Sequence, residues 1–326
     1  MLGVGTCSRC ACPLEHGDLR CAICGLATPV PVRDDALAPR AKINRCSECG
    51  AAIAYDAAKA APSCAFCGAV MRLEEPVDPV ENAEWTLPFS VEPARAQAAL
   101  RGWMRSLGFF RPSDLAKQSR LQSLVPLWWA AWIFDAQANV TWAADSNAGA
   151  GRAAWAPHSG ETPMAFERVV VSASRGLTGK ECDDLVSHYE LGSAAREQSG
   201  PPGAVLETFD VQRSAARRII VTAIERIAGA RLTRGQIPGS KFRNVHVSTV
   251  LYGLRTFRFG LPAYVLAYRY RDRVYRAIVH GQDARVVLGT APYSMAKIAL
   301  VIAGVLAGFG LVGLFLLLGV VFGQPR

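Results

Sequence analysis

The sequence predicts an α+β protein with two N-terminal zinc ribbons, a central domain of helices and antiparallel strands, and one C-terminal transmembrane helix. Eight of the ten cysteines form four C-x-x-C pairs, helical and strand-like apolar patterns alternate in the middle of the chain, and the last segment is continuously apolar. The predicted organisation is a first ribbon at 1–25, a linker at 26–45, a second ribbon at 46–73, an acidic, proline-rich linker at 74–88, the α+β domain at 89–292 and the transmembrane helix at 296–323.

The cysteine pairs have the spacing of metal-binding ribbons. The first module contains Cys7, Cys10, Cys21 and Cys24, and the second contains Cys46, Cys49, Cys64 and Cys67. In such a module each C-x-x-C pair lies on a tight turn, and a short hairpin brings two pairs together around one Zn²⁺ ion. We therefore expect two structural Zn²⁺ ions in closed sites, with no open coordination position for catalysis.

Two details of the ligand set stay open. Glycine directly follows every pair except the one that ends at Cys10, so Cys12 or His16 is an alternative to Cys10 as a ligand. Iron in a rubredoxin-like site is the chemical alternative to zinc. The first residues lack the charged and apolar regions of a secretory signal, so the thiols are expected in the reducing cytoplasm.

Apolar periodicity between residues 89 and 292 predicts helices and strands in turn. The expected elements are a helix at 93–107, a buried strand at 124–134, a loop at 144–164, a strand at 166–172, a helix at 211–230, and several strands from 245 to 288 with turns at 270–273 and 280–283. Mixed helices and antiparallel strands of this kind are typical of an α+β domain.

Residues 298–323 form the longest apolar stretch of the chain. These twenty-six residues carry no charge, and as a helix they would be about 39 Å long, which exceeds a ~30 Å hydrocarbon core. Arginines gather on the N-terminal side, so the positive-inside rule places the N-terminal part in the cytoplasm and the chain in the inner membrane as a single-pass protein. Two G-x-x-x-G patterns leave self-association through this helix open.

Basic residues are concentrated just before the apolar stretch. From Asp210 to Lys297 there are sixteen Lys and Arg against four Asp and Glu, whereas the rest of the chain has twenty bases and twenty-three acids. Three interpretations stay open: attraction to an anionic lipid bilayer, a solvated face that only sets the topology, and nucleic-acid binding, which is the least favoured.

Six segments resemble a bacterial family of membrane-anchored zinc-ribbon proteins: the second module, PFSVEPARAQAALRGWM, VPLWWAAWIFDA, FERVVVSASRGL, LPAYVLAYRYRDRVYRAIVHG and GTAPYSMAKI. Members of that family are labelled transcription-factor-IIB-type zinc ribbons or relatives of the primosomal helicase. The resemblance implies a non-catalytic membrane protein with a recruitment role and with phage-shock or flotillin-like proteins as partners. This chain differs by its additional N-terminal ribbon and by a shorter run between the central strands.

The residue pattern argues against an enzyme. No G-x-x-x-x-G-K-[ST] loop is present, which excludes a helicase, and no H-E-x-x-H pattern is present. Cys182 stands among acidic residues that are expected to raise the pKa of its thiol. We therefore expect a non-catalytic, tail-anchored scaffold that recruits a cytoplasmic protein partner. The alternative is a membrane-tethered regulator that binds nucleic acid.

Overall fold

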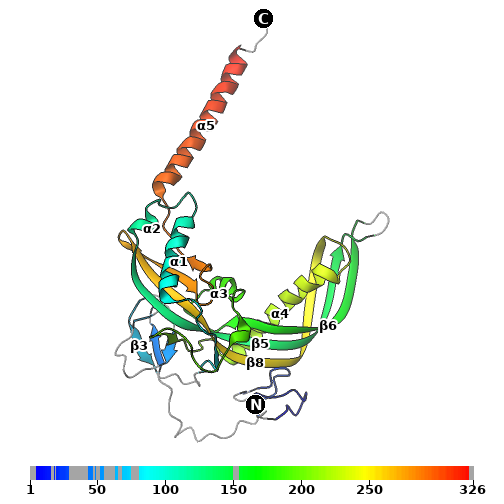
Figure 1. Ribbon diagram of the computed structural model, residues 1–326. Helices are drawn as coiled ribbons and strands as arrows, with labels where there is room; N and C mark the ends of the chain where they lie inside the picture. Colours follow the sequence, from blue (N-terminus) through cyan, green and yellow to red (C-terminus); the bar gives the residue numbers. More distant parts are fainter. Residues whose placement is uncertain are drawn as a thin grey trace.

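In the part of the chain that the structure describes, the named strands form a small three-stranded sheet and a large seven-stranded sheet (Figure 1). The computed structural model describes residues 5–15, 18, 20–28, 43–46, 48, 52–54, 63–64, 68–74, 81–149 and 154–322, with the side chains of the last helix described as far as Leu311. The α+β class expected from the sequence is the class of this described part.

Helices and strands follow one another along the described ranges. They are β1 (Ile43–Cys46), β2 (Ala52–Ala54), β3 (Met71–Glu74), β4 (Trp85–Thr86), α1 (Pro93–Ser106), α2 (Leu115–Gln118), β5 (Arg120–Ser146), β6 (Ala156–Ser172), α3 (Gly179–Val186), the 3-10 turn η1 (Leu191–Ser193), β7 (Val205–Leu206), α4 (Arg213–Gly235), β8 (Phe242–Tyr270), β9 (Arg273–His280), β10 (Val287–Gly289) and α5 (Met295–Phe322).

Two very long antiparallel strands, β5 and β8, organise the large sheet. The strand order is β10-β9-β8-β5-β6, with the short strands β4 and β7 added in parallel to β8 and β5. β9 covers only the inner end of β8, from Ala263 to Tyr270, and β6 covers only the outer part of β5, from Ala131 to Ser146. The outer part is therefore a three-stranded extension, here called the arm (residues 131–146, 156–172 and 242–259).

The middle of β5 is buried on both faces, which explains its unbroken apolar sequence. Trp129 and Ala131 pack into an apolar cluster with residues of α3, whereas Trp132 and Phe134 pack into a second cluster with α4. Because successive side chains of a strand point to opposite faces, a strand covered on both sides has no polar alternation.

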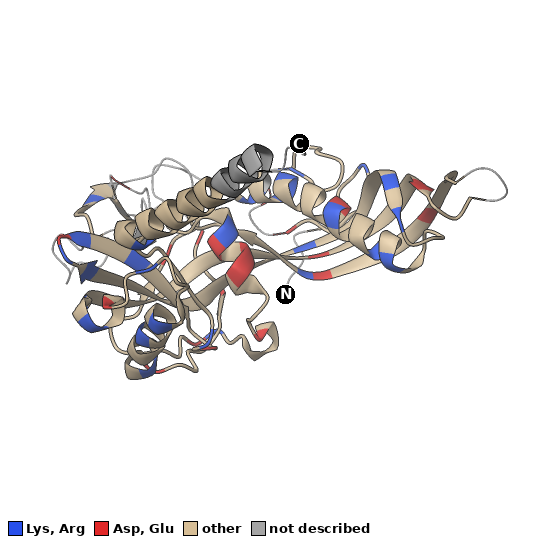
Figure 2. Ribbon diagram, turned by 90° about the horizontal axis from the view of Figure 1, so that it is seen from above, with Lys and Arg blue, Asp and Glu red and all other residues tan. Residues whose placement is uncertain are grey.

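Helix α4 covers one face of the arm (Figures 1 and 2). Its buried residues recur every four positions, at Ala216, Ile220, Ile224, Ala228 and Leu232, and form one apolar stripe. Helix α1 covers the inner end of the sheet in the same way, where its buried side chains meet Tyr264 and Tyr268 of β8. Three register shifts between β5 and β8 accompany the strong curvature of the long strands.

The predicted loop at 144–164 is wrong. β5 continues to Ser146, and β6 begins at Ala156 and pairs with β5 in unbroken register as far as Phe166, which lies opposite Ala136. The sequence suggested a loop because of Pro157 and Pro163, but β6 is an outer strand, where a missing backbone N–H faces away from the sheet.

The predicted transmembrane helix and the single-pass inner-membrane location are also corrected. A helix does form there, α5, but none of the helices in the described part of the chain meets the length and apolarity required to cross a membrane.

Candidate metal centre and its docking on the sheet

Four cysteines of the first predicted ribbon come together at one point. The Sγ atoms of Cys7 and Cys24 are 3.5 Å apart, as are those of Cys10 and Cys21, and all four Sγ atoms lie within 4.8 Å of one another. A tetrahedron with Zn–S bonds of ~2.3 Å has S–S edges of about 3.8 Å. The four sulfur atoms are therefore close enough to hold one metal ion, as the sequence predicted.

Each C-x-x-C pair in this module lies on the same kind of turn. The N–H of Ala11 donates to the carbonyl of Cys7 (2.9 Å), and the N–H of Gly25 donates to the carbonyl of Cys21 (3.0 Å). Both closing residues have positive φ, +57° for Ala11 and +70° for Gly25. The first turn therefore has the same backbone conformation as the glycine-closed turn, although alanine occupies the closing position. Holding alanine at positive φ costs about 1 kcal/mol.

The turn geometry also favours the thiolate at one of the four ligand positions, Cys7. The N–H groups of Cys10 and Arg9 point at the sulfur of Cys7 and lower the pKa of its thiol to about 6. A thiolate is the form that binds a metal ion, so the backbone already favours the ligand state at this position.

Cys12 is separate from the cluster. Its side chain is buried, its Sγ faces the carbonyl of Pro13 at 3.6 Å, and it is not among the four clustered thiols. Burial, followed by the negative charges of Cys21 and Cys7, raises the pKa of its thiol. The geometry therefore selects Cys10 over Cys12 as the ligand, and His16 lies outside the described residues.

The expectation of two zinc ribbons is corrected to one four-cysteine cluster within the described ranges. In the second module, Cys46 and Cys64 are buried, and Gly68 closes the Cys64 turn at φ +78° with an N–H···O bond of 2.8 Å, as Gly25 does in the first module. The other two predicted ligands, Cys49 and Cys67, lie outside the described residues, so only two sulfur positions are defined there.

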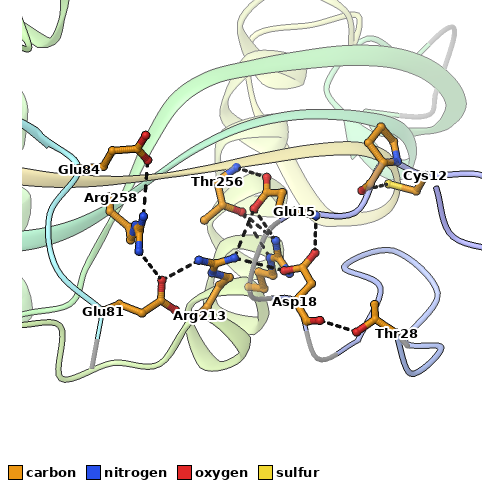
Figure 3. Close-up of polar contacts among 11 residues, drawn as sticks. Cys12, Glu15, Asp18, Thr28, Glu81, Glu84, Arg213, Thr256 and Arg258 are labelled. Carbon is orange, nitrogen blue, oxygen red and sulfur yellow. Dashed lines mark hydrogen bonds and ion pairs between the residues drawn. The ribbon is translucent and has the colours of Figure 1, made fainter. Parts of the chain in front are cut away.

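Two acidic residues attach the first module to the large sheet (Figure 3). Glu15 and Asp18 lie in the hairpin between the two cysteine pairs. Arg217 of α4 binds both carboxylates, at 2.8 Å to Glu15 Oε2 and 2.7 Å to Asp18 Oδ1. Arg213 lies one turn earlier on α4 and contacts Asp18 at 3.4 Å and Glu81 at 2.6 Å.

This ion-pair cluster is largely removed from water. The side chain of Asp18 is 2% exposed and that of Arg217 is 10% exposed. The neighbouring Ile23 packs against both the cysteine cluster and the apolar cluster beneath α4. Charge-assisted hydrogen bonds in such surroundings contribute more than exposed ion pairs, so the module is fixed to the sheet domain by both charge and apolar contact.

Along the edge of β8 that faces away from β5, the docked module is the last segment that occupies a backbone N–H group. Along that edge, β9 pairs with Ala263–Tyr270, β4 pairs with Phe259 and Gly260, and the N–H of Glu84 bonds the carbonyl of Arg258 at 2.9 Å. The N–H of Thr256 then donates to Glu15 Oε1 at 2.7 Å. From Arg255 outward to Phe242, no described strand other than β5 pairs with β8.

No family model, curated protein or solved structure matches this chain. The resemblance to membrane-anchored zinc-ribbon proteins therefore stays a prediction.

The two outer edges of the arm differ in chemistry. The β6 edge carries prolines and charged residues (Pro157, Glu161, Pro163, Glu167 and Arg168), which prevent pairing with a further strand. The β8 segment from Val245 to Leu254 has no proline and no acidic, lysine or arginine residue, and Val250 and Tyr252 are more than half exposed. This segment, here called the open edge, keeps the properties of a strand that can accept another.

Several titratable groups are buried in the sheet domain. Glu207 is fully buried, accepts hydrogen bonds from Ser174 Oγ (3.0 Å) and Ala130 N–H (3.3 Å), and has its pKa raised to about 8 by burial. Burial, with the negative charge of Glu207 nearby, raises the pKa of Cys182 to about 11, so this thiol stays protonated. Burial also lowers the pKa of His280 to about 4.

Sequence reasoning found the four clustered cysteines but missed the residues that dock them. Glu15 and Arg217 are 202 residues apart, and no spacing rule connects them. The one available signal was the presence of two acids in a short metal-binding hairpin of a chain whose later half is strongly basic.

Proposed function

We propose that this protein is a non-enzymatic scaffold in which a zinc-bound ribbon, docked on a curved sheet, supports the recruitment of a partner protein through the open edge of β8. The observation that carries the proposal is the contrast between the two edges of the arm. One edge carries prolines and charges, whereas the other has a ten-residue uncharged stretch that ends at the docked module.

The metal ion in this proposal is Zn²⁺. Four thiolates from paired C-x-x-C turns form the donor set of structural zinc sites, and a site filled by four protein ligands leaves no position for a substrate. Cys7, Cys10, Cys21 and Cys24 would hold the ion, whose role is to stabilise a module too small to fold by apolar burial alone.

The partner in this proposal supplies an extended strand. A strand that pairs with the open edge satisfies the outward N–H and C=O groups of β8, and its side chains contact Val250 and Tyr252 on the exposed face. The ribbon fixes where the added strand must stop, because Glu15 already occupies the Thr256 N–H.

Site-specific photo-crosslinking in cells tests the proposal. A photoreactive residue at Val250 is expected to capture a discrete protein, whereas the same residue at Ala165, which is exposed on β6 at the other edge of the arm, captures none. The substitution Val250→Lys is expected to remove binding of that captured protein, and Ala165→Lys is expected to leave it unchanged. Identical products at both positions, or unchanged binding by Val250→Lys, would reject the open edge as the recruiting surface.

Filter binding of the full chain to DNA and RNA tests the alternative. The regulator hypothesis requires salt-sensitive affinity below micromolar. The scaffold proposal expects no such affinity. Binding of this strength would favour the nucleic-acid-binding regulator over the scaffold.

A further inference from the structure

A second surface lies at the opposite end of the sheet from the arm, where β8 turns into β9 and where α5 begins. Three segments meet there: Ser294 N–H donates to the carbonyl of Phe110 (2.8 Å), Lys297 Nζ donates to the carbonyl of Arg111 (2.9 Å), and Tyr270 OH donates to Asp114 Oδ1 (2.8 Å). We call this surface the basic end, made of residues 109–120, 269–275 and 290–297.

The basic end carries a strong excess of positive charge. It contains seven cations (Arg111, Lys117, Arg120, Arg269, Arg271, Arg273 and Lys297) and two acids (Asp114 and Asp272). Among the described residues, the only contact between these cations and a carboxylate is Arg271 with Asp114, at 4.0 Å. The region around the base of α5 is accordingly rich in Lys and Arg in Figure 2. Most of this charge is therefore not neutralised by the residues that the structure describes.

Large apolar side chains are exposed among these cations. Phe109 is 60% exposed, Tyr293 is 61% exposed and Met295 is 73% exposed. Two of the cations stack on them: Arg111 lies 3.7 Å from the ring centroid of Tyr293, and Lys297 lies 5.1 Å from that of Phe109. Exposed aromatic rings and cations in one surface match an interface with a negatively charged outer layer and an apolar layer below it.

The same surface is hollowed. A cavity of about 1030 Å³ is lined by Asp114, the β8–β9 turn from Tyr270 to Arg273, Tyr275, and the start of α5 up to Lys297. Arg271 and Arg273 stand at this turn, and Met295, Ala296 and Lys297 at the start of α5 line the same cavity. Guanidinium groups bind phosphate oxygens through charge-assisted hydrogen bonds.

We propose that the basic end binds the surface of an anionic phospholipid bilayer, with lipid phosphates at Arg269, Arg271 and Arg273 and with Phe109, Tyr293 and Met295 at the level of the headgroups. This surface is distinct from the open edge of β8, so the inference goes beyond the scaffold proposal and does not depend on it. The charge of the basic end is complementary to such a layer, and its exposed rings are of the type found at lipid–water boundaries.

Co-sedimentation of the zinc-loaded full chain with vesicles tests this proposal. The comparison is between pure phosphatidylcholine and a 70:30 mixture with phosphatidylglycerol, using the wild type and the triple variant Arg269→Gln/Arg271→Gln/Arg273→Gln. Each neutralised arginine is expected to weaken binding to the anionic vesicles about five-fold, or about 100-fold for the three together. The wild type is expected to bind phosphatidylcholine weakly and to lose anionic binding as salt rises.

A matched control comes from α4. Arg218, Arg226 and Arg234 are exposed and have no carboxylate partner within the described ranges, so their triple Gln variant removes the same charge from another surface. It is expected to bind anionic vesicles within about three-fold of the wild type. Equal losses in the two triple variants, or equal wild-type binding to both vesicle types, would overturn the proposal.

Two competitors separate lipid from other phosphate sources. Ten-millimolar glycerol phosphate is expected to leave vesicle binding nearly unchanged, and its full competition would show a small-molecule phosphate site instead. A DNA duplex is expected to bind the wild type and the basic-end variant equally weakly, with no affinity below micromolar. A 100-fold loss of DNA binding in the variant would show a general polyanion site and overturn the assignment to lipid.

Discussion

Replacing Arg217 by methionine should release the first cysteine module from the large sheet while leaving its four-cysteine cluster intact. The arginine side chain is 10% exposed and makes two short ion pairs, at 2.7 Å to Asp18 and 2.8 Å to Glu15, with a further hydrogen bond of 3.1 Å to Thr256 Oγ1. Methionine keeps most of the apolar stem and removes the charge. The variant therefore tests the ion pairs and not the packing.

The expected loss of docking free energy depends on which ion pairs remain in the variant. Breaking a buried ion pair usually costs about 3–5 kcal/mol because the partner is left buried and uncompensated. Arg213 stays within 3.4 Å of Asp18 and 3.9 Å of Glu15, so part of the compensation is retained. We expect the free energy of undocking to fall by about 2–3 kcal/mol.

Amide hydrogen exchange at Thr256 measures this directly. Its N–H lies on the outer edge of β8 and is held by Glu15 Oε1, so it exchanges when the module undocks. A loss of 2–3 kcal/mol corresponds to roughly 30- to 150-fold faster exchange. Arg218→Met, on the exposed side of α4, is the control and is expected to change the rate less than two-fold. Unchanged Thr256 exchange in Arg217→Met would refute the docking argument.

Three further predictions concern the cysteine cluster and the buried carboxyl group. Ala11→Gly should raise the free energy of unfolding of the metal-bound protein by up to about 1 kcal/mol in urea titrations, because glycine adopts φ +57° without strain. Cys10→Ser should lower the zinc content measured by atomic absorption by one ion per chain, whereas Cys12→Ser should leave it unchanged; the reverse result would make Cys12 the ligand. Burial raises the pKa of Glu207 from 4.5 to about 8, so its protonated form stabilises the fold below pH 4.5 and this stabilisation is lost as the pH rises through 8. Between pH 6.5 and 8 the wild type should lose about 2 kcal/mol relative to Glu207→Gln, because His280 contributes equally in both proteins, and parallel pH profiles of the two proteins would contradict this.

The features that the sequence predicted correctly depend on residues close together along the chain. The C-x-x-C pairs predicted the four clustered sulfurs because a two-residue spacing brings both thiols to one side of a tight turn. The periodic apolar residues predicted α1 and α4, since a helix repeats its buried face every three or four residues. The hairpin at Tyr270–Arg273 was also predicted, because polar residues interrupt two strongly apolar strands there.

The tertiary structure decided what depends on contacts between distant residues. The true length of β6 was hidden because Pro157 and Pro163 are tolerated in a strand that pairs with one neighbour, β5, among the described strands. The closing role of Ala11 was hidden because the rest of the turn imposes a positive φ on a residue that rarely adopts it.

By itself, the sequence determined which residues can bind a metal and which faces must be buried. Whether the metal module stands apart or docks on the sheet was decided only by the fold, because Glu15 and Asp18 meet Arg217 across about two hundred residues of chain. Ion pairs of this kind form at distances of a few ångströms in space, and no periodicity along the chain encodes that proximity.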